Sequence, residues 1–502
     1  MNRGVTLVVM GSVRRVTPTA AVVTIAALIS LCVPALAGAQ SPPEVANPAL
    51  PEGTVTKTYR FPLTVKPGQN LNLYNFLNTP DGTTRPDENG WIVGFRPNLR
   101  RMDGSTPPVD EIHLHHAVWV VGGRPTFAAG EEKTSILPPT GYGYRYTTDQ
   151  RWILNHMIHN LTASPEKVWI EYSIDFLPDT APAAASMKAV QTEWVDVMGT
   201  TAYPVFDVRK GEGTAGKLTY PRDTSAALAG RNRRLIDHDG TLVGTAGHLH
   251  PGGLYTELFL TRGDRTVKLF RSNAYYYGRA KFTSWNVSMG VPTDNWRIAV
   301  KKGDVLSVQG TYDTTKAAWL ESMAISPTMM TTQPDGGIDP FTETPDQTEV
   351  LTHGELKENR DRGGLPNPGL ADPRKLKDGP KLRTVDIKDF LYQQGDLSLP
   401  GKKGRPPVVG AGKQLKFVNE DPVREIFHTV TPCKAPCNRS SGISYPLADA
   451  KQVDSGELGF GPVGVTAAAN RADWSMPVGT KKGTYTYFCR VHPFMRGAFR
   501  VK

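Results

Sequence analysis

The chain has 502 residues, which is longer than one ordinary domain and predicts two to four. Its hydrophobic content of 39% and charged content of 21% are typical of soluble globular proteins with buried cores. The formal net charge of +10 is spread along the chain without a dense basic run interleaved with aromatic residues, so nucleic-acid binding is not expected. The 49 glycines and 41 prolines favour β-structure with many turns.

Residues 1–39 have the pattern of a secretory signal peptide. Three arginines precede the apolar run TAAVVTIAALISLCVPALA, and two overlapping small-residue cleavage sites end at Ala37 and Ala39. We therefore expect export to the periplasm or the extracellular space, by the Sec or the twin-arginine route. An uncleaved anchor is the alternative. No later apolar stretch approaches the roughly 18 residues of a membrane span, so no membrane association is expected after cleavage.

The rest of the chain predicts an all-β fold. Runs such as HAVWVVGG, KVWIEYSIDFLP and LYTELFLTRG read as strands separated by Gly, Pro and Asp turns. Residues 40–208 and 209–340 are each long enough for one β-sandwich. Residues 341–383 are polar and rich in Pro and Gly, which predicts a linker. Residues 384–502 return to short strands and have the size of a third, smaller sandwich.

Most of the chain's 11 histidines gather in three clusters: HLHH at 113–116, HMIH at 156–159 and HLH at 248–250. Two histidines at positions i and i+2 of a strand point to the same face and can share one ion. Neutral imidazole suits copper or zinc, so the clusters predict metal sites. Hydrogen-bonded core histidines are the alternative. His238 and His353 are interpreted as turn and linker residues rather than ligands.

The chain ends in YFCRVHPFMRGAFRVK, with Cys489, His492 and Met495 spaced three residues apart. A copper ion that cycles between Cu(I) and Cu(II) favours a soft thiolate, two imidazoles and a weak thioether. His428, in NEDPVREIFHTVTP, is the only other histidine after residue 383 and supplies the second imidazole. Metal binding also explains an unpaired cysteine in an exported protein. Cys433 and Cys437 are expected to form a local disulfide, with a second metal site as the alternative.

These residues resemble the cupredoxins, the blue copper proteins. The short Cys-x-x-His-Pro-Phe-Met loop is most similar to that of amicyanin. The resemblance implies a cupredoxin β-sandwich over residues 384–502 that holds a type 1 copper. It implies the ligands His428, Cys489, His492 and Met495. It also implies electron transfer with a redox partner protein or a small reductant.

The N-terminal motifs resemble the copper type II ascorbate-dependent monooxygenases, the family of peptidylglycine α-hydroxylating monooxygenase and dopamine β-monooxygenase. The wider sequence is also similar to stress-upregulated nodulin-type proteins. The shared order is a His-His pair, a single His, a His-x-His pair and a Met. The resemblance implies two sandwiches of monooxygenase type and two further copper ions. One would be held by His115, His116 and His159; the second, catalytic one, which binds O2, by His248, His250 and Met323.

Two departures limit this resemblance. Residues 41–335 contain no cysteine, whereas the family has core disulfides, and Ala246 stands where the family has a carboxylate-binding arginine. A peptide or catecholamine substrate is therefore not supported, and the substrate stays unknown. His113 could replace His115 as a ligand, and His156 could replace His159. A non-catalytic copper-binding or storage protein, and a pure electron carrier, are the alternative functions.

Overall fold

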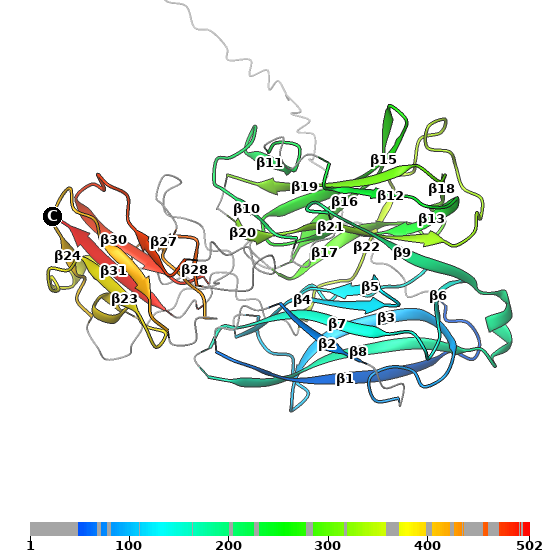
Figure 1. Cartoon of the computed structure of the whole chain (residues 1–502), viewed down its shortest axis with the longest axis horizontal. Helices are drawn as coiled ribbons and strands as arrows, with labels where there is room; N and C mark the ends of the chain where they lie inside the picture. The colour runs from blue at the N-terminus through cyan, green and yellow to red at the C-terminus, as the bar shows by residue number, and fades with distance from the viewer. Residues whose placement is uncertain are drawn as a thin grey trace, which may run out of the picture. The chain divides into compact units, whose positions relative to one another are not determined.

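The computed structural model describes residues 49–67, 72–77, 82–109, 111–162, 164–199, 204–224, 230–277, 285–315, 319–357, 371–397, 404–421, 426–433, 435, 455–459, 471–490, 492 and 495–502. The predicted signal peptide lies outside these residues. Within them the secondary structure is strands and three short 3-10 helices: η1 (Pro182–Ser186), η4 (Pro373–Lys375) and η5 (Gln393–Gly395). The all-β prediction is confirmed (Figure 1). No helix in this described part has the length and apolar character to cross a membrane.

Two sheets enclose the first hydrophobic core. One sheet contains, in spatial order, β1 (Val55–Val65), β8 (Glu166–Pro178), β3 (Gly90–Arg101) and β6 (Tyr142–Tyr146). The other contains β2 (Leu73–Phe76), β7 (Trp152–Asn160), β4 (Ile112–Val121) and β5 (Arg124–Ala129). Phe95 of β3 stacks on Phe127 of β5, with ring centroids 4.4 Å apart, and meets Trp119 of β4 edge-on at 4.7 Å. This aromatic packing holds the strands that carry the first two histidine clusters.

A second core is enclosed by strands from the next part of the chain. Its first sheet contains β9 (Lys188–Asp196), β21 (Ala324–Thr331), β13 (Gly240–Thr245) and β18 (Ile298–Val300), with β14 (His248–Leu249) beside β21. The opposite sheet contains β11 (Lys217–Tyr220), β19 (Val305–Asp313), β15 (Gly253–Arg262), β16 (Arg265–Tyr276), β17 (Val287–Pro292), β22 (Glu349–Leu351) and β12 (Arg233–Leu235). A separate pair is formed by β10 (Phe206–Val208) and β20 (Trp319–Ser322).

Strand β9 connects the two cores. It pairs in parallel with β6 and antiparallel with β21, so one nine-stranded sheet continues through both. Val190 of β9 belongs to the first core and Val195 to the second. Strand β22 lies within the stretch predicted as a linker, yet it pairs with β17. The start of that stretch therefore extends the second sheet.

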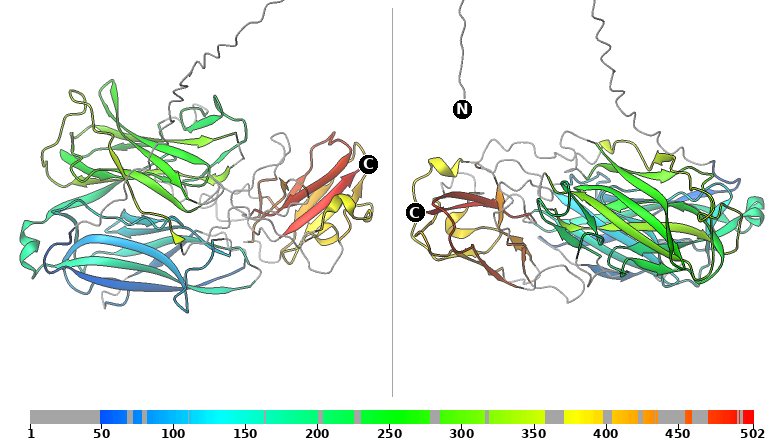
Figure 2. Two further views of the ribbon diagram at one scale, coloured as in Figure 1. Left: turned by 180° about the vertical axis from the view of Figure 1, so that it is seen from behind. Right: turned by 90° about the horizontal axis from the view of Figure 1, so that it is seen from above.

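The third core lies within the C-terminal stretch. A three-stranded sheet contains β23 (Thr384–Ile387), β25 (Lys416–Asn419) and β29 (Asp473–Ser475). A four-stranded sheet contains β24 (Val408–Val409), β31 (Arg496–Val501), β30 (Gly483–Phe488) and β27 (Thr431–Cys433), and β26 (His428–Thr429) pairs with β28 (Glu457–Leu458). These strands are seen from two further sides in Figure 2. Phe417, Tyr487 and Phe499 fill the space between them, together with Cys489 and Met495.

Candidate metal centres

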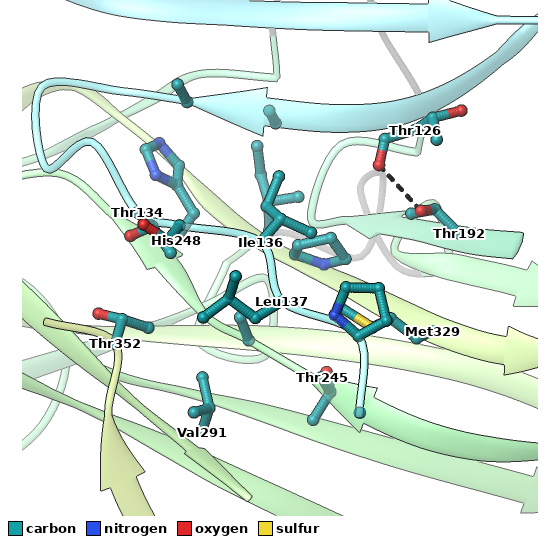
Figure 3. Close-up of a pocket in the computed structure, with 18 of the residues that line it drawn as sticks. Thr126, Thr134, Ile136, Leu137, Thr192, Thr245, His248, Val291, Met329 and Thr352 are labelled. Atoms are coloured by element: carbon teal, nitrogen blue, oxygen red, sulfur yellow. Dashed lines mark hydrogen bonds between the residues drawn. The ribbon is translucent and has the colours of Figure 1, made fainter. Parts of the chain in front are cut away.

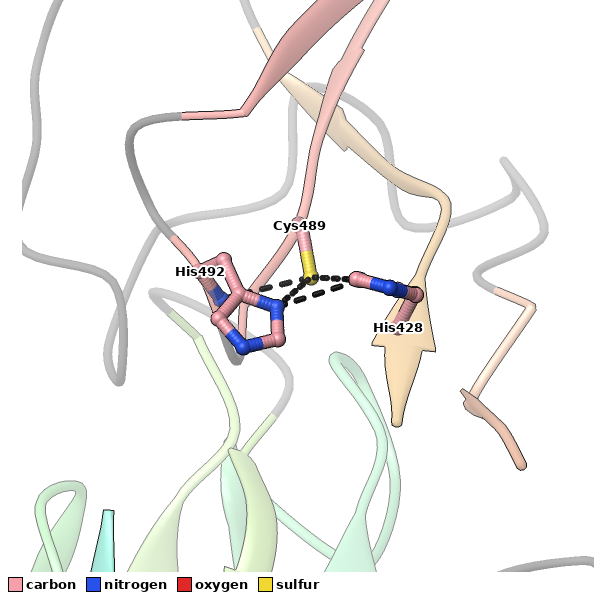
Figure 4. Close-up of side chains that lie close together, drawn as sticks. All are labelled: His428, Cys489 and His492. Atoms are coloured by element: carbon pink, nitrogen blue, oxygen red, sulfur yellow. Dashed lines mark hydrogen bonds between the residues drawn. The ribbon is translucent and has the colours of Figure 1, made fainter. Parts of the chain in front are cut away.

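Three side chains converge in the C-terminal part of the chain: His428 on β26, Cys489 directly after β30 and His492 in the following loop (Figure 4). Cys489 Sγ lies 3.6 Å from His492 Nδ1 and 3.9 Å from His428 Nδ1, and the two Nδ1 atoms are 3.1 Å apart. All three residues are fully buried. Donor atoms at this spacing can all reach one ion at metal–ligand distances of about 2.0–2.3 Å.

Met495 belongs to the same buried cluster as Cys489. The loop is closed by two backbone hydrogen bonds: Met495 N–H donates to the carbonyl of His492 at 2.8 Å, and Cys489 N–H donates to that of Met495 at 3.2 Å. Strand β31 begins at the next residue. The structure therefore brings the four residues predicted for the type 1 centre into one buried place.

The surrounding hydrogen bonds fix the positions of the cysteine sulfur and of one imidazole. The backbone N–H groups of Thr429 and His492 both donate to Cys489 Sγ at 3.3 Å. His428 Nε2 is hydrogen-bonded to the buried carboxylate of Asp421. Its other ring nitrogen, Nδ1, is thereby directed at Cys489.

Burial and hydrogen bonding act in opposite directions on these histidines. Burial lowers the pKa of His428, but the hydrogen bonds to Asp421 and Cys489 outweigh it and raise the pKa to about 8. Burial, together with His428, holds the pKa of His492 well below its usual value. Phe390 lies edge-on to both rings, at centroid distances of 5.9 Å and 5.0 Å, and covers the pair with apolar surface.

Asp421→Asn is expected to weaken copper binding without destroying the centre. The amide keeps the shape of the carboxylate but lacks its charge, so it holds His428 less firmly. Replacing such a partner of a metal ligand typically costs about 10–100-fold in metal affinity. Competition titration against a copper chelator would measure the change. Unchanged affinity would mean that Asp421 does not position the imidazole.

A second group of donor atoms lies in the N-terminal part of the chain. It consists of His115 on β4, His159 on β7 and Glu321 on β20, whose ligand atoms all lie within 4.8 Å of one another. His115 Nε2 is 3.5 Å from Glu321 Oε2. The His115 and His159 rings are 5.0 Å apart between centroids, and the His250 ring is 4.6 Å from that of His115. His250 Nδ1 donates to the backbone carbonyl of Glu321.

A β-bulge lies at His115. In the pairing of β4 with β7, Leu114 is opposite Ile158 and His116 is opposite Met157, so His115 is the extra residue. A bulge re-aims side chains locally and interrupts the alternation of faces. Adjacent side chains of a regular strand point to opposite faces, but at this bulge His115 and His116 meet, with their Nδ1 atoms 3.1 Å apart.

Glu321 was not predicted from the sequence. It is one of 48 acidic residues, and nothing in its local pattern marks it as a ligand. Its backbone has a φ of 53°, a left-handed conformation that non-glycine residues rarely adopt and that costs roughly 1–3 kcal/mol. It lies where the register of β10 with β20 shifts between Phe206 and Val208. The strained backbone places both the carboxylate and the carbonyl of Glu321 against histidines.

The other predicted ligands have different partners. His116 shares one hydrogen bond with His115 Nδ1 and another with Asn72 Oδ1, each 3.1 Å long. His248 Nδ1 is 2.7 Å from Glu132 Oε1. Met323 packs in an apolar cluster with Met157, Val205 and Ile325.

The two alternative histidines are also buried. His113 packs on Trp285, with centroids 4.3 Å apart, and its Nδ1 lies 3.6 Å from Glu131 Oε2. His156 Nε2 is hydrogen-bonded to Asn75 Oδ1 at 2.8 Å. Neither joins the group of His115, His159 and Glu321.

A cavity of about 820 Å³ adjoins this region (Figure 3). His116, His248 and Met323 lie in its wall. The remaining lining is mainly apolar side chains and threonines, among them Ile136, Leu137, Val291, Met329, Thr126, Thr192, Thr245 and Thr352. A cavity of this size and composition fits a small, largely apolar molecule.

The described cysteines agree with the sequence expectation. Cys433 is disulfide-bonded, and Cys489 is buried with a free thiol. Cys437, the expected partner of Cys433, lies outside the described residues. Because Cys489 is not in a disulfide, its sulfur is available for metal binding.

Comparison with known proteins gives only remote similarities. No family model matches the chain, and no curated protein matches it significantly. The chain is similar to a purple cupredoxin from Nitrosopumilus maritimus, with 18% identity over 19% of this chain and 75% of that chain and a TM-score of 0.13. It is also similar to a mutant of amicyanin in the Cu(I) form, with 20% identity over 27% of this chain and 95% of that chain and a TM-score of 0.14.

A copper-containing nitrite reductase from Thermus scotoductus has 14% identity over 53% of this chain and 58% of that chain, with a TM-score of 0.14. The infectious bursal disease virus VP2 particle has 10% identity over 62% of this chain and 81% of that chain, with a TM-score of 0.18. TM-scores this low assign neither a family nor a function. The candidate centres therefore depend on their own geometry.

Proposed function

We propose that this chain is an exported copper protein that transfers electrons through a type 1 centre at His428, Cys489, His492 and Met495. The observation that carries the proposal is one buried cysteine sulfur 3.6 Å and 3.9 Å from the Nδ1 atoms of two histidines, with Met495 closing the same loop. Thiolate, two imidazoles and a thioether are the donor set of blue-copper electron-transfer sites. Copper bound there would supply a one-electron couple.

The protein residues would keep such a centre rigid and dry. The hydrogen bond between His428 and Asp421 and the two N–H donors to Cys489 Sγ hold the donor atoms in place. Complete burial of Cys489 and Met495 keeps water from the sulfur atoms. A site whose ligands are already positioned needs little rearrangement when the charge of the ion changes.

Copper content and visible absorption of the full-length protein test this proposal. The oxidised protein should be blue, because charge transfer from a thiolate to Cu(II) absorbs visible light. Anaerobic reduction should bleach the colour, and reoxidation should restore it. A colourless protein that contains its full complement of copper would overturn the assignment.

Met495→Leu is expected to keep the blue colour and to raise the reduction potential. The axial thioether is a weak ligand that tunes the metal, whereas the other three ligands hold it. Leucine has a similar volume and should fill the buried space at a cost below about 1.5 kcal/mol. Redox titration of the blue band would give the shift. Loss of copper from this variant would show that Met495 holds the ion.

A second candidate function is oxidation of a small apolar substrate with O2 in the N-terminal part, as a monooxygenase would do. The cavity of about 820 Å³ favours it, because its wall contains His116 and His248. His116 is hydrogen-bonded to His115, and the His248 ring is 5.2 Å from that of His250. The type 1 centre would pass on electrons from a redox partner protein or a small reductant. A tether of a few tens of residues would raise its effective concentration toward millimolar.

A further inference from the structure

Donor groups from separate segments of the chain meet at one point of the N-terminal part. His115 and His159 come from the paired strands β4 and β7, Glu321 comes from β20, and His250 follows β14. The resemblance to the copper monooxygenases divides these histidines between two copper ions and does not include the carboxylate. In the structure the carboxylate and two of the imidazoles form one group, and the third imidazole contacts it through Glu321 and His115.

His159 Nε2 and His250 Nε2 are buried without a hydrogen-bond partner among the described residues, as are both ring nitrogens of the neighbouring His113. His159 and His250 are 6% and 3% exposed, so bulk solvent does not reach these nitrogens. A buried polar atom left unsatisfied costs about 1–3 kcal/mol. His250 donates its other nitrogen to a backbone carbonyl, an arrangement typical of histidines that bind a metal. A metal ion would satisfy both Nε2 atoms.

The remaining residues of the two predicted copper sites have other hydrogen bonds or apolar neighbours. His248 Nδ1 bonds to Glu132, and His116 bonds through both ring nitrogens, to His115 and to Asn72. Met323 is 1% exposed within an apolar cluster, as core methionines commonly are. We propose that the N-terminal part holds one mononuclear metal site, formed by His115, His159, His250 and Glu321. This site replaces the two copper ions that the resemblance to copper monooxygenases implies.

The donor set indicates the ion. Three imidazoles and a carboxylate contain no sulfur, so they do not provide the soft environment that favours Cu(I). Among first-row divalent ions, Cu²⁺ binds nitrogen and oxygen donors most tightly. The site is therefore a Cu(II) site without the intense blue colour of a thiolate-bound ion. It shares no residue with the type 1 centre.

The test is copper content together with electron paramagnetic resonance of the full-length protein, after loading with Cu(II) and removal of excess ion. We expect two copper ions per chain, one blue and one colourless. His159→Ala should remove the colourless ion and leave the blue one. Glu321→Gln should weaken the binding of the colourless ion. The loss should exceed the about 10–100-fold that is typical when a residue hydrogen-bonded to a ligand is replaced.

Met323→Leu is the matched control, because it changes a buried neighbour that is a ligand only in the two-copper assignment. We expect it to keep both copper ions and an unchanged colourless signal. Three copper ions in the wild type, or loss of one ion from Met323→Leu, would overturn the single site. So would a chain that binds only the blue ion. The blue band reports on the type 1 centre separately, and circular dichroism shows whether each variant is folded.

Discussion

Cys489→Ser is expected to abolish the blue colour and to remove the type 1 copper. The visible band needs a thiolate, and serine offers a hydroxyl that stays protonated and binds copper weakly. Two imidazoles and a thioether would remain, which is too few strong donors to retain the ion through purification. Copper per chain should fall by one, and the absorbance of the oxidised protein in the blue band should fall to baseline.

The substitution should leave the fold intact, which makes the result interpretable. Serine is close to cysteine in shape, and its oxygen can still accept hydrogen bonds from the N–H groups of Thr429 and His492. Circular dichroism and thermal unfolding of the variant should therefore resemble those of the wild type. Met495→Leu serves as a control with a change of similar size in the same core. Persistence of the blue band in Cys489→Ser would exclude Cys489 as a ligand.

The grouping of His428, Cys489 and His492 could be predicted because two of these residues are close neighbours in the sequence. Cys489, His492 and Met495 lie on one short loop, and the three-residue spacing is sufficient to suggest a common ion. His428 was the remaining candidate for the second imidazole, since the C-terminal stretch contains only two histidines. What the sequence could not indicate was Asp421, because its hydrogen bond to His428 depends on how the chain folds back before β26.

The N-terminal group could be predicted only in part. The histidine clusters indicated where buried donor groups gather, but the predicted alternation of side chains along a strand assumed that each strand is regular. The bulge at His115 breaks that alternation, and β14 ends at Leu249, before His250. The position of Glu321 depends on a left-handed backbone, which a sequence pattern does not reveal.

The turn residues and the alternation of apolar and polar residues were sufficient to predict an all-β fold. They did not predict how the sheets connect. Strand β9 contributes Val190 to one core and Val195 to the next, because a strand can continue past the edge of one packed layer into another. The predicted boundary after residue 208 assigns the whole of β9 to the first domain, although Val195 packs in the second core. The polar stretch after residue 340 similarly conceals β22, whose three residues are too few to show periodicity.

Reduced full-length protein is expected to consume O2, and His250→Ala should abolish this while leaving the blue band unchanged. His250 is a ligand both in the single site and in the predicted pair of copper ions, so the expectation does not depend on how many ions the N-terminal part holds. Its loss removes a buried imidazole and the hydrogen bond to the Glu321 carbonyl, but no residue of the type 1 centre. An oxygen electrode with ascorbate as reductant measures the rate.

His238→Ala is the control, because His238 is partly exposed and bonds to Asp237 rather than to any candidate ligand. It should consume O2 at the wild-type rate. Cys489→Ser should separate the two centres. It should slow O2 consumption driven by a protein reductant, whose electrons would enter through the type 1 copper, and it should spare consumption driven by ascorbate, which does not need that copper. Equal rates in His250→Ala and wild type would mean that the N-terminal metal does not react with O2. The chain would then be an electron carrier with a second, structural metal site.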